Sequence, residues 1–291
     1  MIDTEVQKSQ RSQRMAPSTN TAPWALDKLP PFPLVASRLL QLLAKEDPDI
    51  SEVGRMIAAE PVFATRVLQM ANSPLFALTA QVKTLSHAIV VLGLARVKSI
   101  TVTRALGDFV APALSVRSLR VCWQNSLAGA LLAEKLARAC KMDPDVAYVA
   151  GLLRDIGRLA LLVKYPESYA NLLAVSGEHA FDLMSTEQEL FDLDHCQAGE
   201  WLMGRMPFPP ELTDVVVHHH DLPTGKAFRL LDLIRIADRM ADALGFAVVT
   251  QAEPLKFGEV LEELPEAALS RVHFEEEELR AEIDARIQTW G

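Results

Sequence analysis

Apolar residues recur along this chain at the three- and four-residue spacing of amphipathic helices. The segment 35–43, for example, places its valine and leucine residues on one face after a proline-stiffened start at 29–33. No run alternates polar and apolar residues over several strands, which leaves 246–250 as a candidate β element. The pattern therefore predicts an all-α fold.

Capping residues and prolines predict where the helices of the first half begin and end. Asp49 or Ser51 is placed to cap a helix that ends before Pro61, and Pro61 itself begins the next helix. The segment 84–109 is predicted to form two helices broken around Gly93.

Longer helices are predicted in the second half of the chain. One spans about 115–141, and another begins at Pro144 and continues to about 165, so that Asp155 lies inside an apolar helix. Shorter helices are expected near 166–176, 182–191, 194–206, 209–219 and 226–245.

These boundaries divide the chain into four parts. Residues 1–27 are rich in Ser, Gln, Thr and Pro and lack periodicity, which predicts a disordered or linker tail. We expect an N-terminal helical subdomain at 28–114, a helical bundle at 115–245 and an acidic helical extension at 246–291. The acidic run 275–278 is interpreted as a solvated helix face, with a docking surface for a basic partner as the alternative.

The composition narrows the classes of function. The chain has 291 residues, of which 49% are hydrophobic, and a formal net charge of −9. Because phosphate recognition needs a basic surface, this charge argues against general nucleic-acid binding. The segment from Glu253 to the end holds 11 acidic and 4 basic side chains, so the main body is close to neutral.

Sparse cysteines and charged interruptions predict a soluble cytoplasmic protein. The three cysteines form no CxxC pair, which favours a reducing compartment, and Cys196 is expected to pack as a small apolar residue because no base is apparent beside it. The longest apolar stretch, 146–163, is interrupted by charged residues, and so no membrane span is expected.

Two acidic residues lie in apolar segments and require an explanation. Asp155 stands in LLRDIG and Asp238 in IADRMAD. An ionised carboxylate in an apolar environment is costly without a partner. One interpretation is a structural network in which Arg154, Arg158 or a histidine neutralises these acids, and the residue types alone favour it.

The alternative interpretation is a metal site. DHCQAGEWL places His195 at the start of a predicted helix, and VVVHHHD places three histidines, 218–220, at the end of another. Imidazole and carboxylate ligands that converge from such positions can bind a divalent ion and activate water.

Several motifs, taken in order, resemble the HDOD domain family. The second half of that family is a relative of the HD phosphohydrolases. The resemblance covers about 28–242 and implies a degenerate HD-like helical fold in bacterial signalling, alone or fused to receiver and cyclic-dinucleotide domains. The segments that carry it are 29–44, PVFATRVLQMANSPLF (61–76), VKTLSHAIVVLG (82–93), AGLLRDIGRLAL (150–161), DHCQAGEWL (194–202) and VVVHHHD (215–221).

The resemblance implies a remnant of the HD metal site. The first ligand histidine of the HD hydrolases falls at Asn125, and their paired His-Asp falls at Arg154 and Asp155, so two histidines are replaced. If a metal is bound, the residues implied to hold it are Asp155, His195, His219, His220 and Asp238, with His218 as a register alternative.

The arginine in this remnant site argues against a metal. Arg154 cannot realistically lose its proton, and its guanidinium would repel a divalent ion. We hypothesise that it stands where the positive charge of the metal would have been and pairs with Asp155 or Asp238. No metal, no cofactor and no catalytic residue is therefore expected.

The sequence thus predicts a non-catalytic bacterial signal-transduction or regulatory module. It would act on a signalling protein partner or a small signal such as a nucleotide second messenger. The first alternative is a metal-dependent phosphohydrolase acting on a nucleotide or cyclic dinucleotide, and the second is a sensor that binds a nucleotide without cleaving it. The sequence identifies neither the ligand nor the oligomeric state.

Overall fold

The computed structural model describes residues 23–30, 38, 49–72, 81–178, 182–205, 208–223, 225, 227–249 and 253–289. Within these ranges it contains helices and no strand, which confirms the all-α prediction. The candidate β element at 246–250 is not a strand over its described part. The predicted tail, apart from 23–27, and the predicted helix at 35–43, apart from Arg38, lie outside the described residues.

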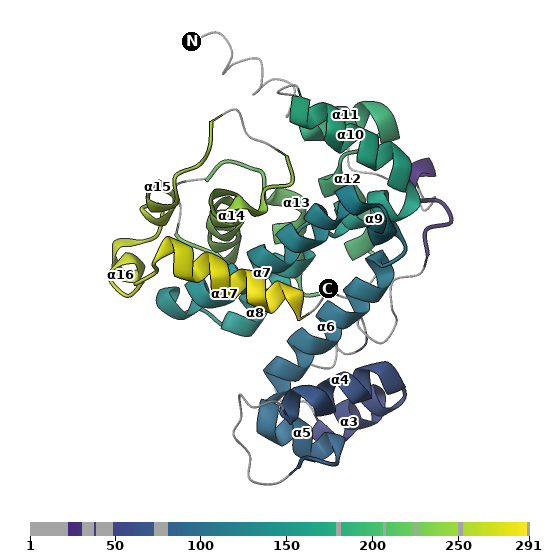
Figure 1. Ribbon diagram of the computed structural model, residues 1–291, viewed down its shortest axis with the longest axis vertical. Helices are drawn as coiled ribbons and strands as arrows, with labels where there is room; N and C mark the ends of the chain where they lie inside the picture. Colours follow the sequence, from purple (N-terminus) through teal and green to yellow (C-terminus); the bar gives the residue numbers. More distant parts are fainter. Residues whose placement is uncertain are drawn as a thin grey trace.

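The first helices form a small layer with its own apolar core. α3 (Ile50–Ala58), α4 (Pro61–Ala71) and α5 (Leu85–Leu92) pack with α6 (Leu94–Val110) at one end of the molecule (Figure 1). Their shared core consists of Val53, Ile57, Phe63, Val67, Ala71, Val82, Ala88, Ile89, Val97, Ile100 and Ala105.

Caps and one glycine set the ends of these helices as predicted. The Asp49 carboxylate accepts from the N–H of Ser51 at the start of α3, and the Thr84 hydroxyl accepts from the N–H of His87 at the start of α5. At Gly93 the backbone has a φ of +80°, which side chains disfavour, and α6 leaves α5 at an angle of 108°. No described helix is by itself long and apolar enough to cross a membrane, although α5 and α6 together reach that length and composition across the bend.

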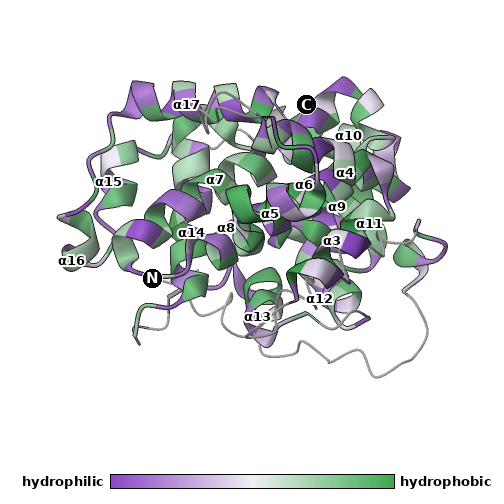
Figure 2. Ribbon diagram, turned by 90° about the horizontal axis from the view of Figure 1, so that it is seen from below, coloured by the Kyte–Doolittle hydropathy of each residue, from purple (hydrophilic) through white to green (hydrophobic). Residues whose placement is uncertain are grey.

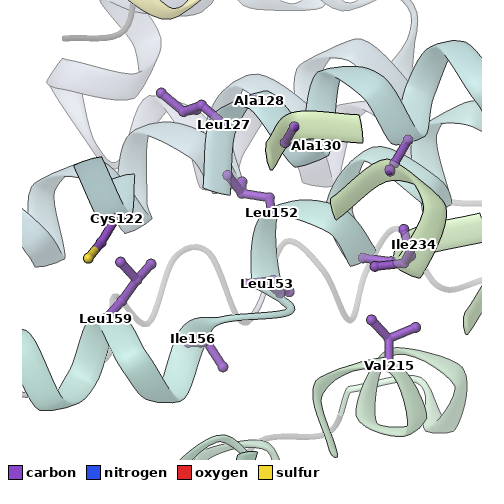
Figure 3. Packing of buried hydrophobic residues seen from close by; sticks show 14 of the residues in the cluster. Cys122, Leu127, Ala128, Ala130, Leu152, Leu153, Ile156, Leu159, Val215 and Ile234 are labelled. Atoms are coloured by element: carbon purple, nitrogen blue, oxygen red, sulfur yellow. The ribbon is translucent and has the colours of Figure 1, made fainter. Parts of the chain in front are cut away.

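A larger layer of helices surrounds the central helix α7 (Arg120–Cys140). Two 3-10 turns precede α7, which therefore begins later than the predicted 115. Aliphatic residues of several helices meet in the main core, as Figure 3 shows for Leu127, Leu152 and Ile234. The other helices of this bundle are α8 (Pro144–Leu153), α9 (Ile156–Lys164), α10 (Pro166–Glu178), α11 (Leu183–Phe191), α12 (His195–Met203), α13 (Pro210–His218) and α14 (Leu230–Ala241).

The single helix predicted from Pro144 to about 165 is wrong, because the structure has two helices there. α8 ends at Leu153 and α9 begins at Ile156, with Arg154 and Asp155 in the turn between them. The apolar pattern continues across the turn because residues on both sides face the same core, so periodicity gives no sign of the break. Asp155 therefore lies beside the N-terminus of α9 and not inside a helix.

Glycines bring the helices around this turn close together. A Cβ atom at Gly157 would lie 2.0 Å from the carbonyl oxygen of His195 and 2.4 Å from the nitrogen of Gly199, so α9 and α12 touch at backbone level. Between α8 and α7, a Cβ atom at Gly151 would lie 2.9 Å from the Cα of Ala130. These contacts hold the start of α12 next to the α8–α9 turn.

The acidic extension is helical and packs on the bundle. After α14 the chain forms a π-helical turn at Asp242–Phe246, and then α15 (Phe257–Leu261), α16 (Glu266–Leu269) and α17 (Glu276–Gln288). α17 lies along α7 (Figure 1), and its three buried aliphatic residues join the main core. Figure 2 shows hydrophilic residues interspersed with them along α17 at the edge of the molecule.

Candidate functional site

The structure brings the predicted site residues together around one cavity. The cavity has a volume of about 890 Å³ and lies between the ends of α11, α12 and α13, helix α14 and the segment that follows α14. Arg154 and Asp155 are buried and contact the residues that line it. The predicted residues that line the cavity are Asn125, His195, His219, His220 and Asp238.

The Asp155 carboxylate lies between two groups of side chains. Its Oδ2 is 3.4 Å from Nε of Arg154. Its Oδ1 is 3.3 Å from Nη2 of Arg158, 3.6 Å from Nε2 of His195 and 3.5 Å from Nε2 of His219. Burial alone would raise the pKa of Asp155, but Arg158 and Arg154 hold that pKa well below its usual range. The ionised carboxylate thus meets Arg154 at Oδ2, which we call the guanidinium side, and meets two imidazoles together with Arg158 at Oδ1, which we call the imidazole side.

The guanidinium side is filled by the buried side chain of Arg154. Its Nε donates to Oδ1 of Asp238 at 2.9 Å, its Nη1 donates to the carbonyl oxygen of Gly151 at 2.8 Å, and its Nη2 donates to Oδ1 of Asn125. Burial disfavours the charge, but Asp238 and Asp155 outweigh it and raise the pKa of Arg154. The pairing hypothesised from the sequence is thus present with both acids.

A glycine on α7 makes room for this guanidinium. A Cβ atom at Gly129 would lie 2.5 Å from Nη1 of Arg154 and 2.9 Å from its Cζ. Because the guanidinium is held by partners on several sides, it has no free direction in which to move. The role of Gly129 could not be predicted, since a glycine inside a helix does not reveal which side chain lies against it.

On the imidazole side, a buried glutamate orients His195. Glu187 Oε2 accepts from Nδ1 of His195 at 2.6 Å and from its backbone N–H at 2.9 Å, while Oε1 accepts from the Tyr169 hydroxyl. Burial opposes both charges, but each partner stabilises the other, so the pKa of Glu187 is lowered and that of His195 is raised well above its usual value. Nε2 of His195 lies 2.9 Å from Nε2 of His220. Burial and the charges of His219 and His195 lower the pKa of His220, so the neutral His220 accepts this hydrogen bond.

His219 is oriented by its own helix and lies beside Cys196. Nδ1 of His219 donates to the carbonyl oxygens of Val215 and Val216 at 3.2 and 3.1 Å, which directs Nε2 toward Asp155. The Sγ of Cys196 lies 4.0 Å from the same Nδ1. Burial opposes ionisation, but the neighbouring histidines lower the pKa of Cys196 to about 6. Cys196 is buried as expected, and the imidazole beside it carries a proton on the nearest nitrogen, which favours the thiolate without acting as a base.

Donor atoms on the imidazole side have the spacing of ligands around one cation. Among the described residues, Asp155 Oδ1 and His219 Nε2 are buried without a hydrogen-bond partner, and they lie 3.5 Å apart. Ligands of a tetrahedral ion with bonds of about 2.1 Å are themselves about 3.4 Å apart. His195, Cys196, His219 and His220 offer ligand atoms within 4.8 Å of one another, a set that suits one divalent ion when the imidazoles are neutral. Nη2 of Arg158 lies 3.3 Å from Oδ1 of Asp155 and 3.4 Å from Nε2 of His195, so an ion here would have a guanidinium beside it. The guanidinium side does not fit a metal, because Arg154 occupies it.

The walls of the cavity are more apolar than its floor. Val248 and Leu255 from the segment after α14 form part of one side, and Leu222 is 79% exposed. Arg239 on α14 pairs with Glu263 at 2.8 Å and so connects the two parts of this wall. The cavity thus combines a polar floor with apolar walls, as sites for small organic ligands do.

Two further residues of the site were missed by the sequence analysis. Glu187 lies eight positions before His195 and belongs to no motif, so its role appears only in three dimensions. Asp242 follows Asp238 by one helical turn, a spacing that could have drawn attention to it. Burial and the charge of Asp238 raise the pKa of Asp242 to about 7.

An all-α domain whose cavity is floored by histidines and acids, with one half of the floor closed by an arginine, is a degenerate HD-like domain. Comparison with known families specifies it further. The HDOD domain family matches residues 29–222, more than half of the chain. The chain therefore belongs to the HDOD domain family.

Similar proteins carry little functional description. An uncharacterized protein of Treponema pallidum is 24% identical over 211 residues, which cover 71% of this chain but only 41% of that protein. An HDOD domain protein of unknown function from Geobacter sulfurreducens has a TM-score of 0.69 at 24% identity, covering 91% of each chain. A candidate signal transduction protein of Marinobacter aquaeolei has a TM-score of 0.63 at 19% identity, covering 98% of this chain and 63% of that one. At these identities the solved structures establish a common fold.

Proposed function

We propose that this protein is a regulatory domain of bacterial signal transduction that binds a small ligand in the cavity and does not hydrolyse it. The observation that carries the proposal is the Arg154 guanidinium, which contacts Asn125, Asp155 and Asp238. These are three of the positions that resemble metal ligands of the HD hydrolases. The positive charge of Arg154, which is part of the chain, thus takes the place of a metal ion that could exchange with solvent.

The energetics of the guanidinium side support this proposal. A metal ion would have to displace a buried arginine from two carboxylates, and a buried charge that loses its partner costs about 3–5 kcal/mol. Neither Asp155 nor Asp238 is then free to hold an ion on that side. Hydrolysis with a pair of metal ions is therefore not available to this site.

Metal content and hydrolysis test the proposal together. Protein purified without a histidine tag is analysed for iron, manganese and zinc, and assayed with bis(p-nitrophenyl) phosphate in the presence of manganese. We expect less than about 0.1 metal ion per chain and no turnover above buffer. Arg154→His should remove the hydrogen bonds of the guanidinium to Asp238 and Asn125. Arg138→His on the surface of α7 is the matched control. Stoichiometric metal together with turnover in the unaltered protein would contradict the proposal.

A second candidate function is favoured by the imidazole side. Asp155 Oδ1 and His219 Nε2 make no hydrogen bond and lie 3.5 Å apart, a spacing that suits one ion, which His195 and His220 would help to hold beside Arg158. Such an ion would supply an activated water for phosphoester hydrolysis. The same measurements decide between the two functions: one metal ion per chain that is lost in His219→Ala, with turnover lost in parallel, selects the hydrolase.

The nature of the ligand is a separate part of the proposal. The polar floor and apolar walls suit a compound with a charged and a nonpolar part, such as a nucleotide second messenger. A ligand that binds only the folded protein at 100 times its Kd stabilises it by about 2.7 kcal/mol. Thermal unfolding with cyclic di-GMP, AMP, adenosine and inorganic phosphate in separate samples tests this class. If none of the four shifts Tm, these ligands are excluded and a protein partner becomes the preferred alternative.

A further inference from the structure

Helix α17 contacts three separate parts of the molecule. Its length lies against α7, as Figure 1 shows. Near its N-terminal end it meets the π-helical turn after α14, and at its C-terminal end it meets α4 of the N-terminal layer. One rigid helix thus spans from the neighbourhood of the cavity to a layer that has its own core.

The first contact is with the wall of the cavity. A Cβ atom at Gly245 would lie 3.4–3.5 Å from the guanidinium atoms of Arg280, so this guanidinium rests on the backbone of the turn. The same turn contains Asp242, which lines the cavity, and its Phe246 carbonyl accepts from Nδ2 of Asn125 on the cavity floor at 3.0 Å. A change in the position of this turn therefore alters its packing against α17.

The second contact is a group of ion pairs on α7. The carboxylate of the buried Glu134 lies 3.3 Å from Arg286 of α17, 3.3 Å from Arg96 of α6 and 2.8 Å from Arg138 of α7 itself. A separate pair joins α17 to the neighbouring residue of α7, with Lys135 and Glu282 2.7 Å apart. Glu134 thus ties α17 and the helix that leads from the N-terminal layer to the same point of the bundle.

The third contact is with the N-terminal layer. A guanidinium nitrogen of Arg66 on α4 donates to the carbonyl oxygen of Thr289, the residue that ends α17. The end of a helix carries unsatisfied carbonyl groups and a partial negative charge, and an arginine there is favourable on both counts. Because α3, α4 and α5 pack on a core separate from the main one, this contact adds an attachment between the two layers.

We propose that α17 is a strap that couples the wall of the cavity to the attachment of helices α3–α5. Movement of the turn at Asp242–Phe246 changes how Arg280 packs, and the rigid helix transmits the change to Arg66. The proposal rests on the proposed function in one respect only, namely that a ligand in the cavity is what moves the turn. The strap itself exists without a ligand.

Hydrogen exchange of the ligand-free, full-length protein tests the strap, read by mass spectrometry in peptides from α3–α5 and from 242–249. Arg66→Ala removes the far contact and Arg280→Ala the near one. Exposed ties of this kind are worth up to about 1 kcal/mol, so we expect exchange about three- to fivefold faster in both regions for each variant. Because coupling between two sites is reciprocal, each substitution should speed exchange in the distant region as well as in its own.

Arg138→Ala is the matched control. It removes an ion pair with Glu134 that lies within α7 and joins no two elements, so exchange in both regions should stay within about 1.5-fold of the unaltered protein. The strap is refuted if Arg66→Ala affects only α3–α5 and Arg280→Ala affects only 242–249. Because no ligand is present, this outcome is independent of whether the cavity binds one.

Discussion

At the scale of the residue, the site is organised by the partners of buried charges. Asp155 shares its two oxygens among two guanidiniums and two imidazoles, and Glu187 is held by His195 and Tyr169. Arg154 fits only because the residue facing it on α7 is glycine. The position of the Arg154 side chain thus depends on the space left by Gly129 as much as on its own hydrogen bonds.

The dependence of Arg154 on Gly129 gives a first prediction. In Gly129→Ala the new methyl group would lie 2.5 Å from Nη1 of Arg154, so the guanidinium must leave some of its partners. We expect a loss of about 2–4 kcal/mol in the free energy of unfolding, as for overpacking combined with a disturbed buried charge. Urea denaturation measures it.

Gly258→Ala in α15 is the control for this substitution. A Cβ atom there meets nothing within 4 Å, and alanine favours a helix over glycine. We therefore expect Gly258→Ala to be neutral or to stabilise the protein by a few tenths of a kcal/mol. Equal destabilisation by the two changes would show that Gly129 serves the helix and not the arginine.

Asp242 gives a prediction about pH. Its pKa rises to about 7 in the folded protein because of burial and of Asp238, against about 3.9 in an unfolded chain. The folded protein therefore keeps a proton that the unfolded chain has lost, and stability falls as the pH rises from about 4 to about 7. Asp242→Asn removes this cost, so the variant should be more stable by about 2 kcal/mol at pH 8 and unchanged near pH 4. Denaturation at both pH values checks the difference, and a gain of the same size at pH 4 would point to another cause.

At the scale of the element, the ends of helices were more predictable from the sequence when a side chain marks them. Asp49 and Thr84 cap α3 and α5 as expected, because capping is a local interaction between neighbours in the chain. The break at Arg154 and Asp155 was not predicted, because apolar residues on both sides face the same core. Its cause is tertiary: the turn satisfies buried charges that come from other helices.

The joint between α5 and α6 allows a prediction at this scale. Gly93 holds a φ of +80°, and α6 turns by 108° from α5 at this residue. A residue with a side chain in such a conformation costs about 1–3 kcal/mol. Gly93→Ala should therefore weaken the N-terminal layer first, seen as faster hydrogen exchange in α3–α5 than in α7. Uniformly faster exchange in both layers would contradict this assignment.

At the scale of the whole molecule, the structure explains why ligand-type residues were easier to predict than their environment. His195, His219 and Asp238 belong to motifs with recognisable spacing, and the structure brings them around one cavity. Glu187 and Gly129 act across helices distant in the chain, and no local pattern marks either. The fold class could be predicted from periodicity, whereas the electrostatics of the site depend on contacts between distant helices that only the three-dimensional structure shows.

The balance of charge in the buried site gives a prediction for the molecule as a whole. Three acids and three cations pair with one another there; they are Asp155, Glu187, Asp238, Arg154, Arg158 and His195. Removal of metals with EDTA should therefore leave Tm unchanged to within about 1 °C, since these pairs stabilise the buried charges by themselves. A fall of several degrees that zinc or manganese reverses would show that the imidazole side is occupied.

The fit between Arg154 and Gly129 also bears on how such a site could arise. A guanidinium placed opposite any larger residue would collide with it, so the glycine has to come before the arginine or together with it. The reverse path has the same constraint, because the arginine at 154 must be replaced before or together with the glycine at 129. An arginine at 154 in this fold therefore depends on a permissive residue on a different helix, and a search for related sites should examine both positions together.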